Sequence, residues 1–281
     1  MNPQTTHLLD HSRSSWSVPT EPRLLRTRIW PSSRPTPAPV VVLSHGTGGA
    51  GEDLDWLAKP LNDAGFLVAS VDHPGNSYND EYLPEGFAFA WDRPRDITLL
   101  IDHLVAEQNI DITKIGAAGF SFGGYTVAAL LGGKIDVHIL EAMFHGQVSA
   151  PDVPEFPDLI TTLRSKYSDA ELTSFAETGA RSMTDTRVRA GILLAPAIGR
   201  LLLSESLRQI SAPVLVRWGD ADDNTPPEDN ALVYRDSMPQ ARGKSLGPDI
   251  GHYVFLGDRD DPSGLRPEVA DDAVTFFSTY L

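Results

Sequence analysis

Short, fully apolar segments recur along this chain, and each one stops at a turn-forming or polar residue. The run at residues 40–43 ends at Ser44, and the run at 67–71 ends at Asp72. Comparable runs cover residues 115–118, 214–216 and, more weakly, 190–194. A strand is apolar on both faces when helices cover both sides of a parallel sheet. The runs therefore predict a parallel sheet buried between two layers of helices.

The segments between these runs place apolar residues at the period of an α-helix. Examples are Ile97, Leu100, Ile101, Leu104 and Val105, and near the C-terminus Val269, Ala273, Phe276, Phe277 and Tyr280. Alternating strands and helices indicate a doubly wound α/β fold, with a mostly parallel sheet, helices on both faces and a ligand site at the carboxyl ends of the strands. Such a fold can hold 281 residues in one domain, so we expect residues 1–281 to form a single domain.

Residues 145–185 interrupt the alternation. Three prolines come first, and apolar residues at helical spacing follow: Leu159, Leu163, Tyr167 and Leu172. A segment of this length cannot readily bury a core of its own, so we interpret it as an insertion that forms a lid over the site. A helix simply packed on the sheet would show the same spacing.

Charge and composition narrow the classes of partner. Asp and Glu number 38 against 23 Lys and Arg, so the net charge of −15 disfavours nucleic acid and anionic membranes and favours a neutral or cationic small substrate. The chain has no Cys, which excludes disulfides, thiolate metal sites and a cysteine nucleophile. Neither His73 nor His145 has a carboxylate or a second His three or four residues further along the chain, so we expect no metal. We also expect no cofactor.

The first 21 residues are polar and lack the apolar centre of a signal peptide, and no apolar run reaches the ~18 residues of a membrane span. We therefore expect a cytoplasmic protein. The sequence leaves its oligomeric state open.

A candidate nucleophile lies in the segment Gly-Phe-Ser-Phe-Gly-Gly at residues 119–124. It follows the run at 115–118 directly and precedes a small-residue, apolar stretch. Between a buried strand and a helix, this pattern predicts a tight turn that presents Ser121 as a nucleophile. A glycine-rich turn that binds phosphate is the alternative, but the segment lacks the Gly-Lys-Ser/Thr ending of a phosphate-binding loop.

A serine hydroxyl needs a base to remove its proton, and the base needs a third group to orient it. His252 precedes the last helix, and a cluster of carboxylates follows the run at 214–216. The order Ser, Asp, His is the one found in α/β-hydrolases. We choose Asp222 as the orienting group and interpret Asp220 and Asp223 as turn-capping, solvent-facing residues.

The segment Ser-His-Gly-Thr-Gly-Gly at residues 44–49 follows the first core run. Backbone N–H groups in a glycine-rich loop can stabilise an oxyanion, and we assign this role to the amides of Thr47 and Phe122. His45 is expected at the pocket as a ring that braces this loop, in preference to a base or a metal ligand.

Five aromatic residues are concentrated in the 14 residues that end at position 91: Tyr78, Tyr82, Phe87, Phe89 and Trp91. They follow a core strand closely and could therefore wall a substrate pocket. Ordinary packing beneath a long loop is an equal alternative.

Taken together, the motifs at residues 44–49, 72–76, 119–124, 219–227 and 251–252 resemble the α/β-hydrolase superfamily. The nearest branch is the predicted dienelactone-hydrolase group, which is similar to bacterial platelet-activating-factor acetylhydrolases, and the resemblance runs from about residue 23 to 281. Dienelactone hydrolases use a cysteine nucleophile, whereas this chain has Ser121. The resemblance therefore implies a serine esterase, with lactones as one candidate substrate class.

The leading hypothesis is hydrolysis of a carboxylic ester, in which Ser121 is acylated, His252 acts as base and then acid, and Asp222 orients the imidazole. The alternatives are an acyltransferase or thioesterase in a biosynthetic pathway, and a ligand-binding protein without catalysis. The insertion is rich in charged residues, which suits a small soluble ester with an acyl group of roughly two to six carbons better than a lipid substrate.

Overall fold

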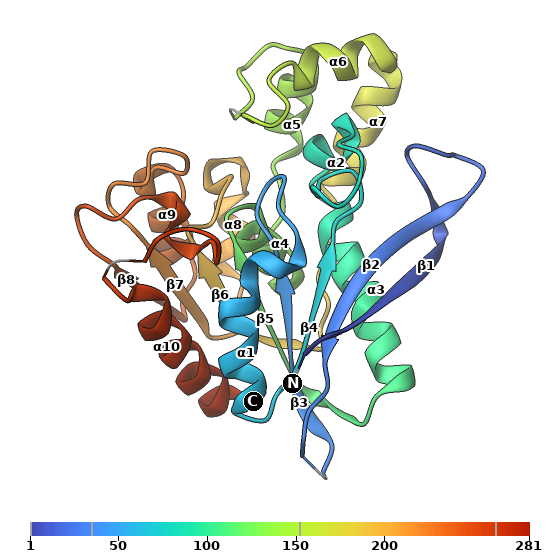
Figure 1. Ribbon diagram of the computed structural model, residues 1–281. Coiled ribbons are helices and arrows are strands. Elements are labelled where there is room, and N and C mark those ends of the chain that lie inside the picture. Colours follow the sequence, from blue (N-terminus) through green and yellow to red (C-terminus); the bar gives the residue numbers. More distant parts are fainter. Residues whose placement is uncertain (1, 35, 152, 262) are drawn as a thin grey trace.

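The computed structural model describes residues 2–34, 36–151, 153–261 and 263–281, so that four residues of the predicted domain, Met1, Pro35, Asp152 and Pro262, lie outside it. Within the described residues an eight-stranded sheet has the order β1-β2-β4-β3-β5-β6-β7-β8 (Figure 1). Its strands are β1 (Gln4–Ser14), β2 (Pro22–Trp30), β3 (Ala38–Ser44), β4 (Leu67–Asp72), β5 (Ile110–Phe120), β6 (Val188–Leu194), β7 (Val214–Trp218) and β8 (Ala241–Ser245).

The sheet is parallel from β4 to β8, and β2 pairs in antiparallel fashion with both β1 and β4. The five apolar runs are β3 to β7, which confirms the predicted doubly wound α/β fold. Sequence reasoning missed β1, β2 and β8. β8 lies at an edge and none of its residues is buried, so it carries no apolar run; β1, at the other edge, is mostly exposed.

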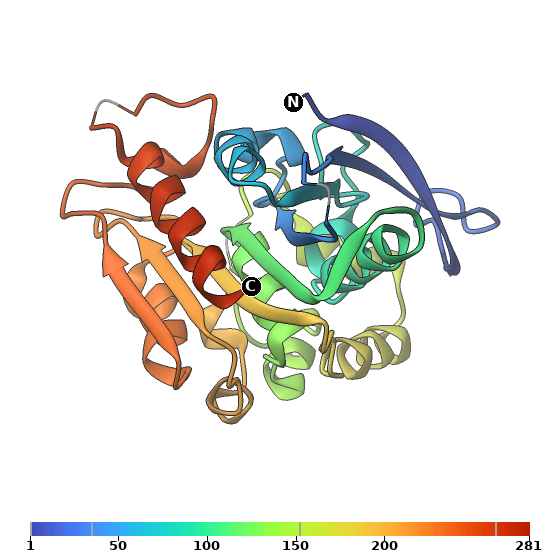
Figure 2. The same cartoon turned by 90° about the horizontal axis from the view of Figure 1, so that it is seen from below.

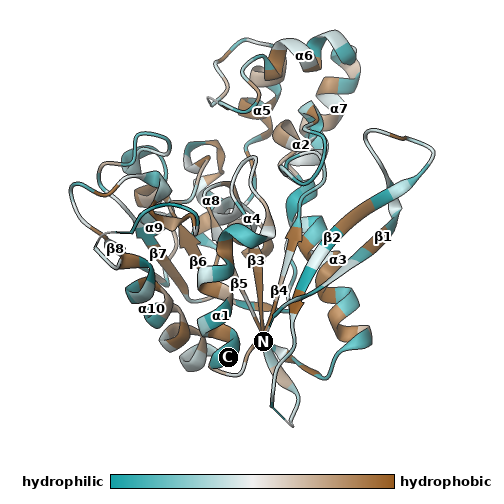
Figure 3. Cartoon of the chain, in the orientation of Figure 1, coloured by the Kyte–Doolittle hydropathy of each residue, from teal (hydrophilic) through white to brown (hydrophobic). Residues whose placement is uncertain are grey.

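Helices cover both faces of the sheet (Figure 2). One face carries α1 (Asp55–Asp63) and α10 (Leu265–Tyr280), and the other carries α3 (Asp92–Glu107), α4 (Phe122–Leu131) and α9 (Ala231–Ser237). The short helix α8 (Ser204–Arg208) contacts α9. The central strands contribute apolar side chains to a hydrophobic cluster on each face of the sheet. They are brown in the hydropathy view (Figure 3).

A group of helices stands beyond the carboxyl ends of the strands (Figure 1). It consists of α5 (Val137–Phe144), α6 (Leu159–Lys166) and α7 (Asp169–Gly179), which lie close to α2 (Pro84–Ala88) of the main body. We call residues 137–179 the cap. The cap starts earlier than the predicted insertion, because α5 belongs to it. The helical spacing from Leu159 to Leu172 extends over two helices, α6 and α7, because Ser168 and Glu171 form a capping box that starts α7.

No helix in the described part of the chain has the length and apolar content needed to cross a membrane.

A buried ionic cluster attaches the β1–β2 hairpin to α3. The Asp96 carboxylate is fully buried and lies 2.7 Å from an Arg13 nitrogen and 3.0 Å from Arg23 Nε. It also accepts a hydrogen bond from His73 Nδ1 at 2.9 Å. Burial by itself would raise the pKa of Asp96, but the two arginines and His73 outweigh it and hold that pKa well below its usual value. Asp96 therefore stays ionised and joins the hairpin to the core.

We predict that Asp96→Asn lowers the free energy of unfolding by about 3–5 kcal/mol, because it leaves buried arginine charge uncompensated. Asp102→Asn is the matched control. Asp102 is 58% exposed and its ion pair with Arg187 is on the surface, so its loss should cost less than about 1 kcal/mol. Equilibrium urea unfolding at neutral pH measures both values. Equal losses in the two variants would contradict the prediction.

Candidate active site

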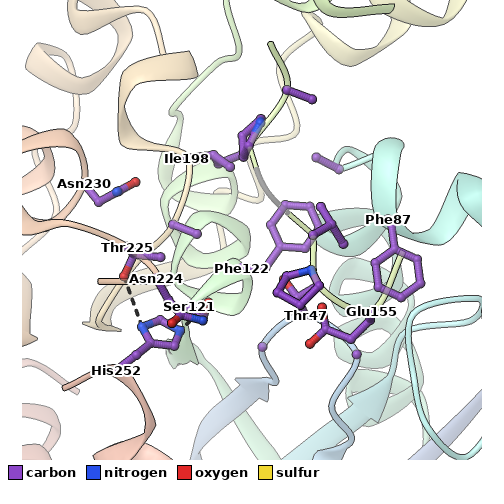
Figure 4. Close-up of a pocket in the computed structure, with 18 of the residues that line it drawn as sticks. Thr47, Phe87, Ser121, Phe122, Glu155, Ile198, Asn224, Thr225, Asn230 and His252 are labelled. Atoms are coloured by element: carbon purple, nitrogen blue, oxygen red, sulfur yellow. Dashed lines mark hydrogen bonds between the residues drawn. The ribbon is translucent and has the colours of Figure 1, made fainter. Parts of the chain in front are cut away.

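Ser121 occupies a strained turn between β5 and α4. Its φ is +53°, in the left-handed region that a residue with a side chain rarely adopts. The flanking glycines make the turn possible, because a Cβ on Gly123 would lie 1.9 Å from the Ser44 carbonyl oxygen and a Cβ on Gly119 would lie 2.1 Å from that of Gly123. The turn directs the Ser121 hydroxyl out of the sheet into the cavity above it (Figure 4).

The fold brings together the three residues proposed for the triad. Ser121 Oγ lies 3.0 Å from His252 Nε2, and His252 Nδ1 lies 2.7 Å from Asp222 Oδ2. A carboxylate only accepts hydrogen bonds, so Nδ1 carries the proton and Nε2 is free to accept from the serine hydroxyl. All three side chains are buried, and Ser121 and His252 line the cavity. They come from loops after β5, β7 and β8, which end at the same edge of the sheet.

The three carboxylates of the acidic cluster have different environments. Asp222 is buried against His252, whereas Asp220 and Asp223 are exposed. Asp220 accepts a hydrogen bond from the Trp218 indole at 3.0 Å. The structure thus places only Asp222 in contact with the imidazole.

Sequence reasoning missed Thr225. Its backbone N–H donates to Asp222 Oδ1 at 2.7 Å, and its hydroxyl donates to Asp222 Oδ2 at 2.8 Å. The same hydroxyl lies 3.1 Å from His252 Nδ1, the contact drawn as a dashed line in Figure 4. Thr225 therefore fixes the carboxylate against the imidazole. The Asp-x-x-Thr spacing, which suits a side chain that bonds to the backbone three residues on, was the available signal.

The two proposed oxyanion donors lie at the switch point of the sheet. The chain leaves β3 toward β4 on one side and reaches β5 on the other, so the loops after β3 and β5 adjoin. Thr47 and Phe122 from these loops line the cavity together with Ser121. Neither of their N–H groups donates a hydrogen bond to any other described residue. Both donors are therefore available to a negative oxygen at this position.

His45 braces the loop from below and does not line the cavity. Its Nε2 accepts from the His73 N–H at 3.0 Å, so Nδ1 holds the proton and donates to the Gly46 carbonyl at 2.7 Å. Burial, followed by the positive charge of Arg93, holds the pKa of His45 well below its ordinary value. A neutral ring with both nitrogens bonded can serve neither as base nor as metal ligand. The prediction that His45 lies at the pocket is wrong, because His45 is buried behind the loop.

The cavity above Ser121 has a volume of about 740 Å³, within the usual range for small-molecule sites. Tyr78 and Phe87 line it. The prediction for Phe89 and Trp91 is corrected, because both rings are buried in the core: they stack on each other with centroids 4.7 Å apart and pack against Phe144 of α5. Tyr82 donates from its hydroxyl to the Gly48 carbonyl at 2.7 Å and thus supports the oxyanion loop.

The remaining walls of the cavity could not be read from the sequence. Cap helices α5 and α6 supply apolar side chains: Leu140, Met143, Phe144, Leu159 and Ile160. Polar groups lie on the side of His252, among them Asn224 and Asn230, and Glu155 of the cap lies near Thr47 (Figure 4). Among the described residues no three His, Asp or Glu side chains are grouped closely enough to hold a metal ion.

Residues 41–265 match the "Alpha/beta hydrolase family". "Putative carbamate hydrolase RutD" of Klebsiella variicola (strain At-22) is 33% identical over 121 residues, which make up 43% of this chain and 40% of that protein. The match therefore spans about two fifths of the length of this curated relative.

Two solved structures share the fold over nearly their whole length. Esterase 2 of Thermogutta terrifontis, phosphorylated by paraoxon, has a TM-score of 0.62 at 16% identity and covers 100% of this chain and 96% of its own. The esterase domain of a Rhodothermus marinus protein has a TM-score of 0.59 at 12% identity, with coverages of 100% and 99%. At these identities the likeness concerns the fold.

For the acidic cluster we predict that Asp222→Asn lowers kcat by ~10³ to 10⁴-fold, because it disturbs the imidazole tautomer and removes the charge that stabilises the imidazolium. Steady-state kinetics on an ester substrate measures the effect. Asp220→Asn and Asp223→Asn are matched controls, and each should cost less than about tenfold because neither carboxylate contacts His252. A larger loss in either control would reassign the orienting carboxylate.

Proposed function

Because the chain belongs to the alpha/beta hydrolase family, we propose that it is a serine hydrolase that cleaves carboxylic esters through an acyl-enzyme. The observation that carries the proposal is the continuous hydrogen-bonded chain from Ser121 through His252 to Asp222, with steps of 3.0 Å and 2.7 Å. The two free N–H groups beside Ser121 complete what acyl transfer requires. The motif residues also favour kinship with the dienelactone-hydrolase branch.

In the acylation step, Ser121 Oγ attacks the ester carbonyl carbon while His252 Nε2 takes the hydroxyl proton. The carbonyl oxygen becomes negative and accepts from the Thr47 and Phe122 N–H groups. The tetrahedral species collapses as the C–O bond to the alcohol breaks, and His252 returns its proton to the leaving oxygen. Asp222 stays ionised throughout and stabilises the imidazolium.

In the deacylation step, His252 Nε2 takes a proton from water, and the resulting hydroxide attacks the acyl carbon. The same two N–H groups stabilise the second oxyanion. The bond between the acyl carbon and Ser121 Oγ then breaks, His252 gives its proton to Oγ, and the carboxylic acid leaves the free enzyme. Among the residues of the site, only Ser121 and His252 change their protonation state during the cycle.

The predicted substrate is a small ester or lactone with a short acyl group. A cavity of about 740 Å³ must hold both the acyl group and the alcohol, and cap side chains close its apolar wall. Each methylene contributes about 0.8 kcal/mol only where the wall leaves room for it. The net charge of −15 further favours neutral or cationic substrates over anionic ones.

We predict that Ser121 reacts with a fluorophosphonate probe, its Oγ forming a bond to phosphorus as fluoride leaves. Ser121→Ala should abolish both labelling and ester turnover, because Ser121 bears the only hydroxyl bonded to His252 Nε2 among the described residues. Gel fluorescence and intact-protein mass spectrometry measure labelling. Ser44→Ala is the matched control, because Ser44 also contacts a histidine but is buried, and this variant should still be labelled. Labelling that persists in Ser121→Ala would refute the nucleophile.

We further predict that kcat/KM along p-nitrophenyl esters from acetate to palmitate is highest for acyl groups of roughly two to six carbons, because longer chains outrun the space beneath the cap. Stopped-time absorbance assays below the micellar concentration give the series. A carbamate and a thioester should be assayed in parallel, since the matched relative is called a carbamate hydrolase. A steady rise through dodecanoate, or activation by micelles, would instead favour a lipase.

A further inference from the structure

A buried cation lies directly beneath the active site and takes no part in the triad. Arg93 belongs to the first turn of α3 and is 1% exposed, which makes it the largest fully buried side chain among the described residues. Burying a guanidinium costs free energy unless the group is fully hydrogen-bonded, so a buried arginine needs a structural explanation. Its contacts supply one, because they reach both halves of the proposed oxyanion site.

On one side, Arg93 holds the loop that carries Thr47. Its Nη2 donates to the His45 carbonyl oxygen, and its Nη1 donates to Asn76 Oδ1 at 3.1 Å. The same Asn76 oxygen accepts from the Gly48 N–H at 2.9 Å. The backbone is thus fixed on both sides of Thr47, and the Gly48 amide is occupied. This leaves the Thr47 N–H as the donor facing the cavity.

On the other side, Arg93 contacts the helix that carries Phe122. Its Nε donates to Thr126 Oγ1 at 3.2 Å, and that hydroxyl donates to the Phe122 carbonyl oxygen at 3.2 Å. The guanidinium carbon lies 4.7 Å from the centroid of the Phe122 ring, a cation–π distance. One side chain therefore touches the first turn of α4 and the loop after β3 simultaneously.

No carboxylate among the described residues forms an ion pair with Arg93. All its hydrogen-bond acceptors are neutral. The carboxylate of Asp96, one turn further along α3, is already engaged by Arg13, Arg23 and His73. Burial lowers the pKa of Arg93 to about 9, which still leaves it protonated at neutral pH. Positive potential in a low-dielectric interior acts strongly on nearby negative charge.

We propose that Arg93 is a positioning residue for the oxyanion site: it fixes the Thr47 and Phe122 N–H groups relative to one another and biases the site toward a negatively charged oxygen. The inference rests on the proposed function, since an oxyanion arises only during acyl transfer. A role of this kind acts on the transition state more than on the bound ester.

The test compares Arg93→Met, Arg93→Lys and Arg217→Met. Arg217 is the matched control, because it is also a buried arginine but is paired with Asp272 on α10, and it is not among the residues that line the cavity. Urea unfolding establishes the range in which each variant is folded, and kinetics are measured there on p-nitrophenyl acetate. The second readout is the inhibition constant of a trifluoromethyl ketone, which adds Ser121 Oγ to its carbonyl carbon and places an oxyanion in the site.

We expect Arg93→Met to lower kcat by ~10² to 10³-fold, the scale of a lost oxyanion donor, with KM changed by less than about threefold. The ketone should bind more weakly by a factor similar to the loss in kcat/KM. Arg93→Lys keeps the charge and should recover at least about tenfold of kcat, while Arg217→Met should stay within about threefold of the unmodified protein. An arginine with only a structural role would change the free energy of unfolding, but it would not lower kcat while leaving KM nearly unchanged.

A folded Arg93→Met with kcat within about threefold of the unmodified protein, or an Arg93→Lys no better than Arg93→Met, would overturn the inference. Absence of both turnover and Ser121 labelling in the unmodified protein would instead overturn the proposed function. In that case the amide ¹H–¹⁵N resonances of Gly48 and Phe122 decide the positioning claim. Both should shift in Arg93→Met and not in Arg217→Met, and unchanged resonances would refute it.

Discussion

The close approach of the β3 loop to the turn at Ser121 is the constraint on which the site depends. A Cβ on Gly123 would lie 1.9 Å from the Ser44 carbonyl oxygen, and one on Gly46 would lie 2.9 Å from the Phe120 ring. Only glycine backbone permits this contact. The contact brings the two candidate oxyanion donors into the cavity that Ser121 lines. The strained φ of Ser121 is tolerated because the surrounding sheet fixes both strands.

A second serine, histidine and aspartate are joined in the same way but are wholly buried. Ser44 Oγ lies 2.9 Å from His73 Nε2, and His73 Nδ1 lies 2.9 Å from Asp96. Burial and Arg93 lower the pKa of His73 to about 3 despite the carboxylate, so this imidazole is a poor base. Burial also keeps substrate away. Hydrogen-bond geometry is therefore not sufficient for a catalytic triad, and access from the cavity separates the two arrangements.

The sequence by itself determined the core of the fold. Runs apolar on both faces can be stable only inside a layered sheet, so β3 to β7 were readable from local composition. The turn at Ser121 was readable as well, because its glycines are needed within a few residues of one another. Chain order then proposed His252 and Asp222 as its partners. The edge strands were not readable, because a strand with few buried residues carries no apolar run.

Tertiary structure alone decided which neighbours meet. Phe87 lines the cavity while Phe89 and Trp91 fill the core, although all three lie within five residues. Phe87 belongs to α2, whereas the other two lie on the segment between α2 and α3. The same holds for Arg93, whose partners come from three separate segments. Long-range contacts of this kind depend on how elements pack, and no local pattern of residue types records the packing. Short motifs in the sequence identify the reacting residues, whereas the cavity walls and the contacts of Arg93 depend on how the folded elements pack.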